Sequence, residues 1–60
     1  MSDMNYIEFR HKQLGVMSVY VYYLSDAKKF AKMQWALGIY DSIVVVNKKD
    51  QDALILGERP

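Results

Sequence analysis

The first third of the chain contains two stretches whose side chains alternate between two sets. In residues 6–11 one set is Tyr6, Glu8 and Arg10, and the other is Ile7, Phe9 and His11. A period of two is typical of a half-buried strand. Residues 16–24 are rich in valine and tyrosine, which favour strands. Gly15 belongs to the short turn between the two stretches, so we expect a β-hairpin here.

Residues 25–38 change to the spacing of an amphipathic helix. The apolar side chains that form one stripe are Ala27, Phe30, Ala31, Met33 and Leu37. Ser25 is a favourable N-cap because its hydroxyl can accept a hydrogen bond from a free amide of the first turn. Gly38 fits the C-cap. We expect a helix of about three turns whose opposite side carries lysines.

Two further apolar runs follow the predicted helix. Residues 42–47 contain a run without alternation at 43–46, which is typical of a strand covered on both faces. Residues 47–52 are polar and predict a turn, and residues 53–56 predict a shorter fourth strand.

These elements predict a single small α+β domain, residues 1–60, with the order ββαββ. The helix joins two strands through short loops, which suits a right-handed crossover between parallel strands. We therefore expect a mixed sheet of about four strands with one helix on one face. In the alternative arrangement, the first hairpin pairs with a second copy of the chain.

The small size of the chain points to association. A domain of 60 residues buries only roughly 60% of its unfolded surface, so its stability alone is marginal. The sequence contains no cysteine, so neither disulfides nor thiolate zinc sites can compensate. Its apolar content of 52% is too high for a disordered chain. We expect it to bind a protein partner, a second copy of itself, or both.

Charge and hydropathy narrow the classes of partner. The net charge of +1 is small for a nucleic-acid binder, which usually carries a clear basic excess. No apolar run approaches the ~20 residues of a membrane span, and the first residues do not resemble a signal peptide. We therefore expect a cytoplasmic protein that does not bind membranes.

The sequence contains no recognisable catalytic or metal-binding pattern. His11 is the only histidine, and at the end of a predicted strand we interpret it as a turn residue. Asp50 and Asp52 lie in the predicted last turn without the glycine and distal glutamate of a calcium loop. The serines lie outside any nucleophile elbow, and the glycines are scattered singly. We expect no catalytic residue, no metal site and no cofactor, and hence a protein that is not an enzyme.

Tyrosines give the first candidate binding surface. If Ile7, Phe9 and the valines of the hairpin face the helix, then Tyr6, Tyr20 and Tyr22 face away from it. Val44 and Val46 are expected to join them. One short helix covers one face of a sheet, so the other face would carry an exposed apolar patch, and such patches usually mark binding surfaces. This face is our candidate for self-association.

Trp35 gives the second candidate surface, together with Lys28 and Lys32 on the same flank of the predicted helix. Tryptophan is enriched at interface hot spots, and the two lysines could steer an acidic partner. Trp35 could equally cover the edge of the core.

Three functional hypotheses follow. The first is a non-enzymatic protein–protein interaction module that acts as a homodimer. The second is binding of single-stranded nucleic acid, because tyrosines on an open sheet face can stack bases. The third is a heterologous partner that contacts the Trp35 flank. The chain is similar in size and pattern to small phage-encoded proteins that bind and block host enzymes, which implies an inhibitor.

Overall fold

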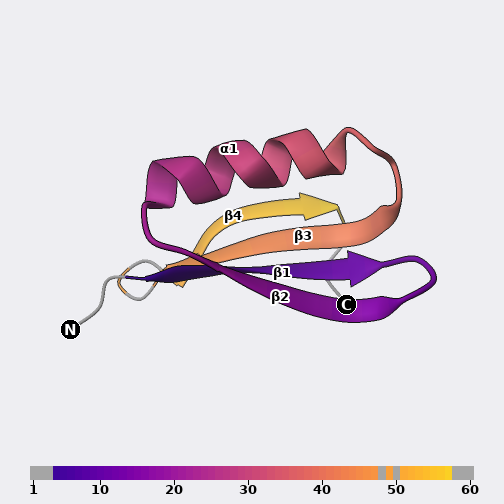
Figure 1. Ribbon diagram of the computed structural model, residues 1–60, viewed down its shortest axis with the longest axis horizontal. Helices are drawn as coiled ribbons and strands as arrows, with labels where there is room; N and C mark the ends of the chain where they lie inside the picture. Colours follow the sequence, from indigo (N-terminus) through magenta and orange to yellow (C-terminus); the bar gives the residue numbers. More distant parts are fainter. Residues whose placement is uncertain (1–3, 48, 50, 58–60) are drawn as a thin grey trace.

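The computed structural model describes residues 4–47, 49 and 51–57, and these form one four-stranded sheet with one helix (Figure 1). The elements, in chain order, are β1 (Asn5–His11), β2 (Gly15–Val21), α1 (Leu24–Trp35), β3 (Tyr40–Asn47) and β4 (Gln51–Gly57). The predicted ββαββ order and α+β class are therefore confirmed.

The order of the strands in the sheet is β2-β1-β3-β4, and every neighbouring pair is antiparallel. The expectation of a mixed sheet is wrong in this respect. β2 and β3 do run in the same direction, as a helical crossover requires, but β1 lies between them and is antiparallel to both. The tight hairpin pairs β2 with one edge of β1, and the other edge of β1 remains for β3.

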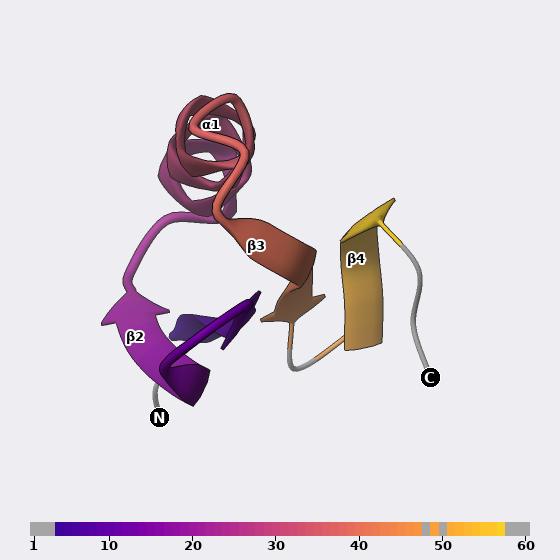
Figure 2. The same cartoon turned by 90° about the vertical axis from the view of Figure 1, so that its right-hand side faces the viewer.

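The helix lies on one face of the sheet, and the core fills the space between them (Figure 2). The alternation expected for β1 is present, because Ile7 and Phe9 are buried while Tyr6 and Glu8 are only half-buried. The buried core residues are Ile7, Phe9, Ala27, Ala31, Tyr40, Ile43 and Val45. Ala27 and Ala31 are short, so their small side chains allow the helix axis to approach the sheet closely.

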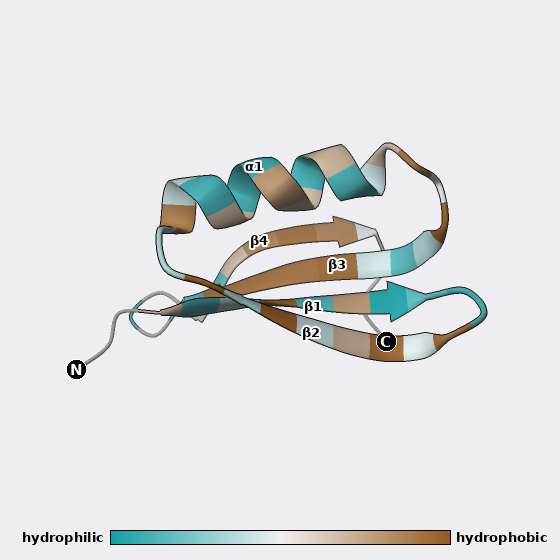
Figure 3. Cartoon of the chain, in the orientation of Figure 1, coloured by the Kyte–Doolittle hydropathy of each residue, from teal (hydrophilic) through white to brown (hydrophobic). Residues whose placement is uncertain are grey.

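The apolar run of β3 is buried on both faces. Ile43 and Val45 belong to the core beneath the helix, whereas Val44 pairs with Glu8 and Ile55 in the ladder and lies on the open face. Val44 is nevertheless only 3% exposed. The central position of β3 explains this, since strands flank it on both sides. The colouring of β3 by hydropathy shows its continuous apolar stretch (Figure 3).

The helix begins one residue before the predicted N-cap. Tyr23 occupies the N-cap position without a side-chain hydrogen bond, so Ser25 lies inside the first turn. At the other end the helix closes at Trp35, and Gly38 follows with a φ of 71°. The amide of Gly38 donates to the Trp35 carbonyl over 3.2 Å. The C-cap is Ala36, so the prediction of Gly38 as the C-cap is wrong by two residues; Gly38 instead supplies a left-handed turn just after the helix.

Asn5 precedes the predicted strand of residues 6–11, but it is 1% exposed and opens β1. Its side-chain amide donates to the carbonyls of Val21 and Tyr22, at 3.3 and 3.1 Å. The side-chain amide of Asn47 in turn donates to the Asn5 side-chain carbonyl. These bonds tie the end of β2 to the start of β1 and, through Asn47, to the end of β3. They also explain why β2 ends at Val21 rather than at Leu24, as the sequence suggested.

Candidate functional site

β2 is an edge strand whose outer side is unpaired in the part of the chain that the structure describes. Its sequence, GVMSVYV, contains no charged residue and no proline, and most of its residues are exposed. It pairs with β1 along its whole length without a register shift. Lysines, prolines and bulges are the usual means by which proteins protect such edges, and β2 has none of them.

The opposite edge, β4, is protected in two ways. Its pairing with β3 shifts register between Val45 and Val46, which indicates a bulge. It also carries an exposed carboxylate at Asp52. The sheet therefore has one edge that is open to an additional strand and one edge that resists it.

An apolar groove lies between the free edge of β2 and the helix. Val19 and Val21 line it on the strand side, and Phe30 and Met33 line it on the helix side. Phe30 is 38% exposed and Met33 is 60% exposed. The groove has a volume of about 360 Å³.

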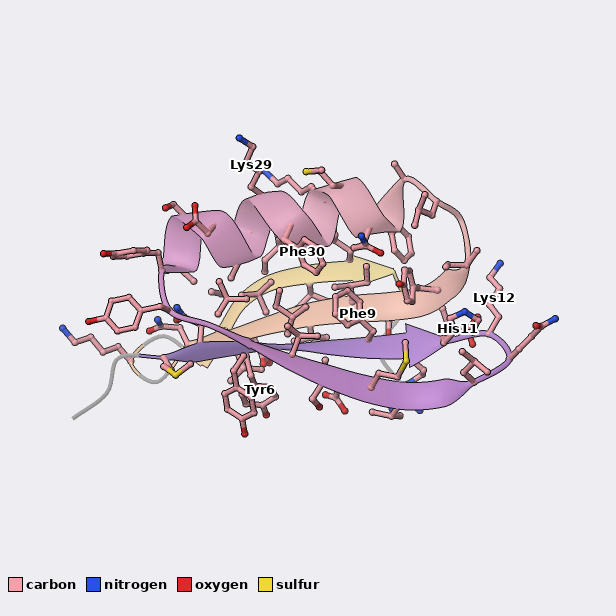
Figure 4. The ribbon with its side chains drawn as sticks, viewed as in Figure 1. Tyr6, Phe9, His11, Lys12, Lys29 and Phe30 are labelled. Carbon is pink, nitrogen blue, oxygen red and sulfur yellow. The ribbon has the colours of Figure 1, made fainter. Side chains whose placement is uncertain are left out.

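Two charged residues lie at the rim of the groove. Asp26 and Lys29 extend from the helix, and Lys29 points away from the sheet (Figure 4). Phe30 points toward the sheet and meets Phe9 edge to face, with ring centroids 6.1 Å apart. Phe30 thus forms the boundary between the buried core and the groove.

The orientation of the helix about its own axis creates the groove, and it differs from the predicted orientation. Ala27 and Ala31 face the sheet, which leaves Phe30 and Met33 on the side toward β2. At about 100° per residue, Phe30 and Met33 lie on the β2 flank of the line through Ala27 and Ala31. The prediction that Phe30, Met33 and Leu37 belong to the buried side of the helix is therefore wrong. Met33 and Leu37 are exposed, and Leu37 lies beyond the end of the helix. The signal that sequence reasoning missed is Leu24, which together with Ala27, Ala31 and Trp35 marks the true buried side.

The open face of the sheet contains two of the three predicted tyrosines side by side. Tyr6 pairs with Tyr20 across the β1–β2 ladder, and their ring centroids are 5.9 Å apart. Tyr6 points away from the helix, as predicted (Figure 4). Tyr20 is 66% exposed. Glu8 and Arg10 follow Tyr6 on the same face, so charges interrupt the apolar surface along β1.

The third tyrosine is separate from this pair. Tyr22 lies after the end of β2, and its ring packs edge to face against Tyr23 with centroids 4.8 Å apart. Val46 remains half-buried on the open face beside Tyr6. The predicted patch therefore consists of one tyrosine pair with a few aliphatic neighbours rather than a continuous surface.

Trp35, Lys28 and Lys32 share the flank of the helix that lies opposite the groove. Trp35 is half-buried and packs against the core. Its ring approaches Gly57 so closely that a Cβ on that glycine would lie 2.7 Å from the ring. Lys28 is half-buried and Lys32 is exposed. Trp35 therefore covers the end of β4, and the lysines extend the flank toward solvent.

His11 has a structural place in the hairpin turn. Its Nδ1 accepts hydrogen bonds from the amides of Gln13 and Leu14, at 3.0 and 3.1 Å. In the same turn, the backbone amide of Lys12 donates to the carbonyl of Ile39 before β3, over 3.1 Å. Figure 4 shows His11 and Lys12 next to each other at this end of the hairpin. This geometry agrees with the interpretation of His11 as a turn residue.

The described residues contain no group of three or more histidines or carboxylates that could hold a metal ion. Asp50 of the predicted acidic turn lies outside these residues. Within the same part of the chain, no helix has the length and apolar content needed to cross a membrane.

Comparisons with protein-family models, with curated proteins and with solved structures gave no match. Among the described residues, the sheet has one unprotected edge, at β2, and this edge borders an apolar groove.

Proposed function

We propose that this chain is a non-enzymatic protein-interaction module that binds an extended protein segment along the free edge of β2. The observation that carries the proposal is the combination of an uncharged, regular edge strand with the adjoining apolar groove. Strand addition of this kind gains affinity from main-chain hydrogen bonds and specificity from pockets for alternate side chains.

The added segment would continue the sheet beyond β2. Every second residue of a strand points to the same face, so alternate side chains of the ligand would lie over the helix side. There they would meet Phe30 and Met33 on α1 and Val19 on β2. This lining favours aliphatic or aromatic side chains in the ligand, and the opposite side chains would lie on the open face beside Tyr20.

We further propose that the protein forms a homodimer and acts in the cytoplasm. We also propose that it blocks a host enzyme in the manner of small phage proteins. Strand addition is compatible with the homodimer and with the inhibitor, because the added strand can come from a second copy or from a target protein. The Trp35 flank with Lys28 and Lys32 stays a predicted second contact for a heterologous target.

Binding of single-stranded nucleic acid is the second candidate, and the Tyr6–Tyr20 pair on the open face favours it. A half-buried ring at Tyr6 beside an exposed ring at Tyr20 can stack bases, at about 1–3 kcal/mol per base. The same face contributes a carboxylate at Glu8 as well as the guanidinium of Arg10, which weakens attraction for phosphates. A labelled oligonucleotide that does not bind micromolar protein at low salt would exclude this candidate.

The proposed function can be tested with a displayed library of extended peptides selected on the immobilised protein. We expect the selected peptides to carry alternating apolar residues and to slow amide exchange in β2. The Ser18→Lys variant places a cation on the edge and should abolish binding, while Gln13→Lys adds the same charge in the exposed turn and should preserve it. Selected peptides that bind Ser18→Lys as tightly as the native chain would refute the proposal.

A further inference from the structure

We propose that the strand added to β2 is β2 of a second copy, in antiparallel register, with a two-fold axis that passes between the two Ser18 residues. This inference rests on the proposed function, because it names the partner of the same edge. It would join two four-stranded sheets into one continuous sheet with both helices on the same face.

The absence of charge on β2 favours a copy of itself as the partner. Across a two-fold axis each residue meets residues of the identical strand, so any charge near the axis faces its like, and like charges directly opposite are destabilising. β2 contains only apolar residues, tyrosine, serine and glycine. β4 would bring Asp52 and a bulge to the same kind of contact. Between the two edges, β2 is therefore the one suited to self-pairing.

The pattern of faces determines the register. In an antiparallel pair, directly opposed side chains lie on the same face of the sheet. Centring the pair on Ser18 brings Met17 opposite Val19 on the helix side and Val16 opposite Tyr20 on the open side. In each of these two pairs, the opposed side chains lie on the same face of the sheet and are both largely apolar. The two Ser18 side chains beside the axis are small.

The same pairing brings the two grooves together. With strands ~4.8 Å apart, and with each helix over β1 and β3, the two helix axes would be about 19 Å apart. Helices in direct contact lie ~8–10 Å apart, so these helices would not touch. The space between them would be lined by Phe30 and Met33 of both copies, above a floor of Val19 from each. Apolar surface that is exposed in one copy would thus face apolar surface of the other.

The size of the contact predicts a dimer that dissociates on dilution. A strand of the length of β2 spans about 23 Å. The dimer contact would consist of one added strand pairing and the groove on one face. We expect its total buried surface to be ~1,200 Å², near the lower limit of specific interfaces. If dimer formation stabilises the folded domain, the melting temperature depends on protein concentration. We therefore expect the mass to change from dimer to monomer across the micromolar range, and the melting temperature to fall with it.

Cysteine cross-linking tests the register directly, because the native sequence contains no cysteine. Opposed Cα atoms in an antiparallel pair are ~4.5–5.5 Å apart, a distance that a disulfide can span. Ser18→Cys should therefore form a covalent dimer under mild oxidation, whereas Gln13→Cys in the exposed turn should not. Val16→Cys and Tyr20→Cys should each remain uncoupled alone, since identical positions lie about 13 Å apart along the strand, but should couple when mixed.

The outcomes separate this inference from the proposed function. Light scattering of the native protein should give the mass of a dimer. Oxidation should couple Ser18→Cys with itself and Val16→Cys with Tyr20→Cys, and should leave Gln13→Cys monomeric. A monomer at every concentration, without cross-links, overturns the inference; if peptides still bind β2, the proposed function survives. A dimer in which Ser18→Cys does not couple and the mixed pair does not either places the contact on another surface, and also overturns the inference.

Discussion

Replacement of Asn5 by alanine should cost this small domain much of its stability. The side chain makes two hydrogen bonds to the carbonyls of Val21 and Tyr22, and accepts one from Asn47. Asn5→Ala leaves three polar groups without these partners in a site where Asn5 itself is almost fully buried. Each unsatisfied buried group costs about 1–3 kcal/mol. Because the carbonyls are only partly buried, we expect a total loss of about 2–3 kcal/mol.

That loss is large on the scale of the whole molecule. At roughly 0.05–0.15 kcal/mol per residue, a domain of this size has a free energy of unfolding of about 3–9 kcal/mol. In a domain this small each kcal/mol shifts the melting temperature by about 4–8 °C, so Asn5→Ala should lower it by about 10–20 °C. Thermal and urea unfolding followed by circular dichroism would measure the change at a fixed protein concentration.

A double-mutant cycle with Asn47 isolates the contact between the two amides. Asn47→Ala removes its bond to Asn5 and also the acceptor for the amide of Lys49, so it should be destabilising by itself. The double variant should lose less than the sum of the single losses, with a coupling of at least ~0.5 kcal/mol. Gln13→Ala, in the exposed turn, is the control and should change stability by less than about 0.5 kcal/mol. A loss below ~0.5 kcal/mol in Asn5→Ala would mean that the asparagine does not hold the end of β2.

Three further substitutions test other parts of the structure. Gly57→Ala should destabilise by more than ~2 kcal/mol, because φ is +85° and a Cβ would overlap the Trp35 ring; little change in urea unfolding would refute that packing. His11→Ala removes the acceptor of two turn amides and should cost about 1 kcal/mol in urea unfolding, whereas a stability equal to the native value would mean that water replaces it. Trp35→Ala should mainly lower the melting temperature, by the equivalent of about 3 kcal/mol, since the ring packs on the core; an unchanged melting temperature with weakened partner binding would instead support the predicted interface role.

Local patterns in the sequence were sufficient to predict the elements and much of the facing of their side chains. The alternation of residues 6–11 correctly assigned Ile7 and Phe9 to the core, because a strand exposes successive side chains on opposite faces whatever its neighbours are. Gly38 indicated the helix end only to within about three residues, because a positive φ is a local requirement of the turn that follows the helix. The outward position of Tyr6 followed from the same alternation and needed no knowledge of the tertiary structure.

The tertiary structure alone decided how these elements meet. The position of β1 between β2 and β3 depends on which strand edge remains free after the hairpin closes, and no local pattern encodes that. The rotation of the helix depends on close packing: Ala27 and Ala31 permit contact with the sheet, while the larger Phe30 is displaced toward β2. That displacement creates the groove. The candidate site is therefore a product of strand order and helix rotation, both of which arise only when distant segments of the chain pack together.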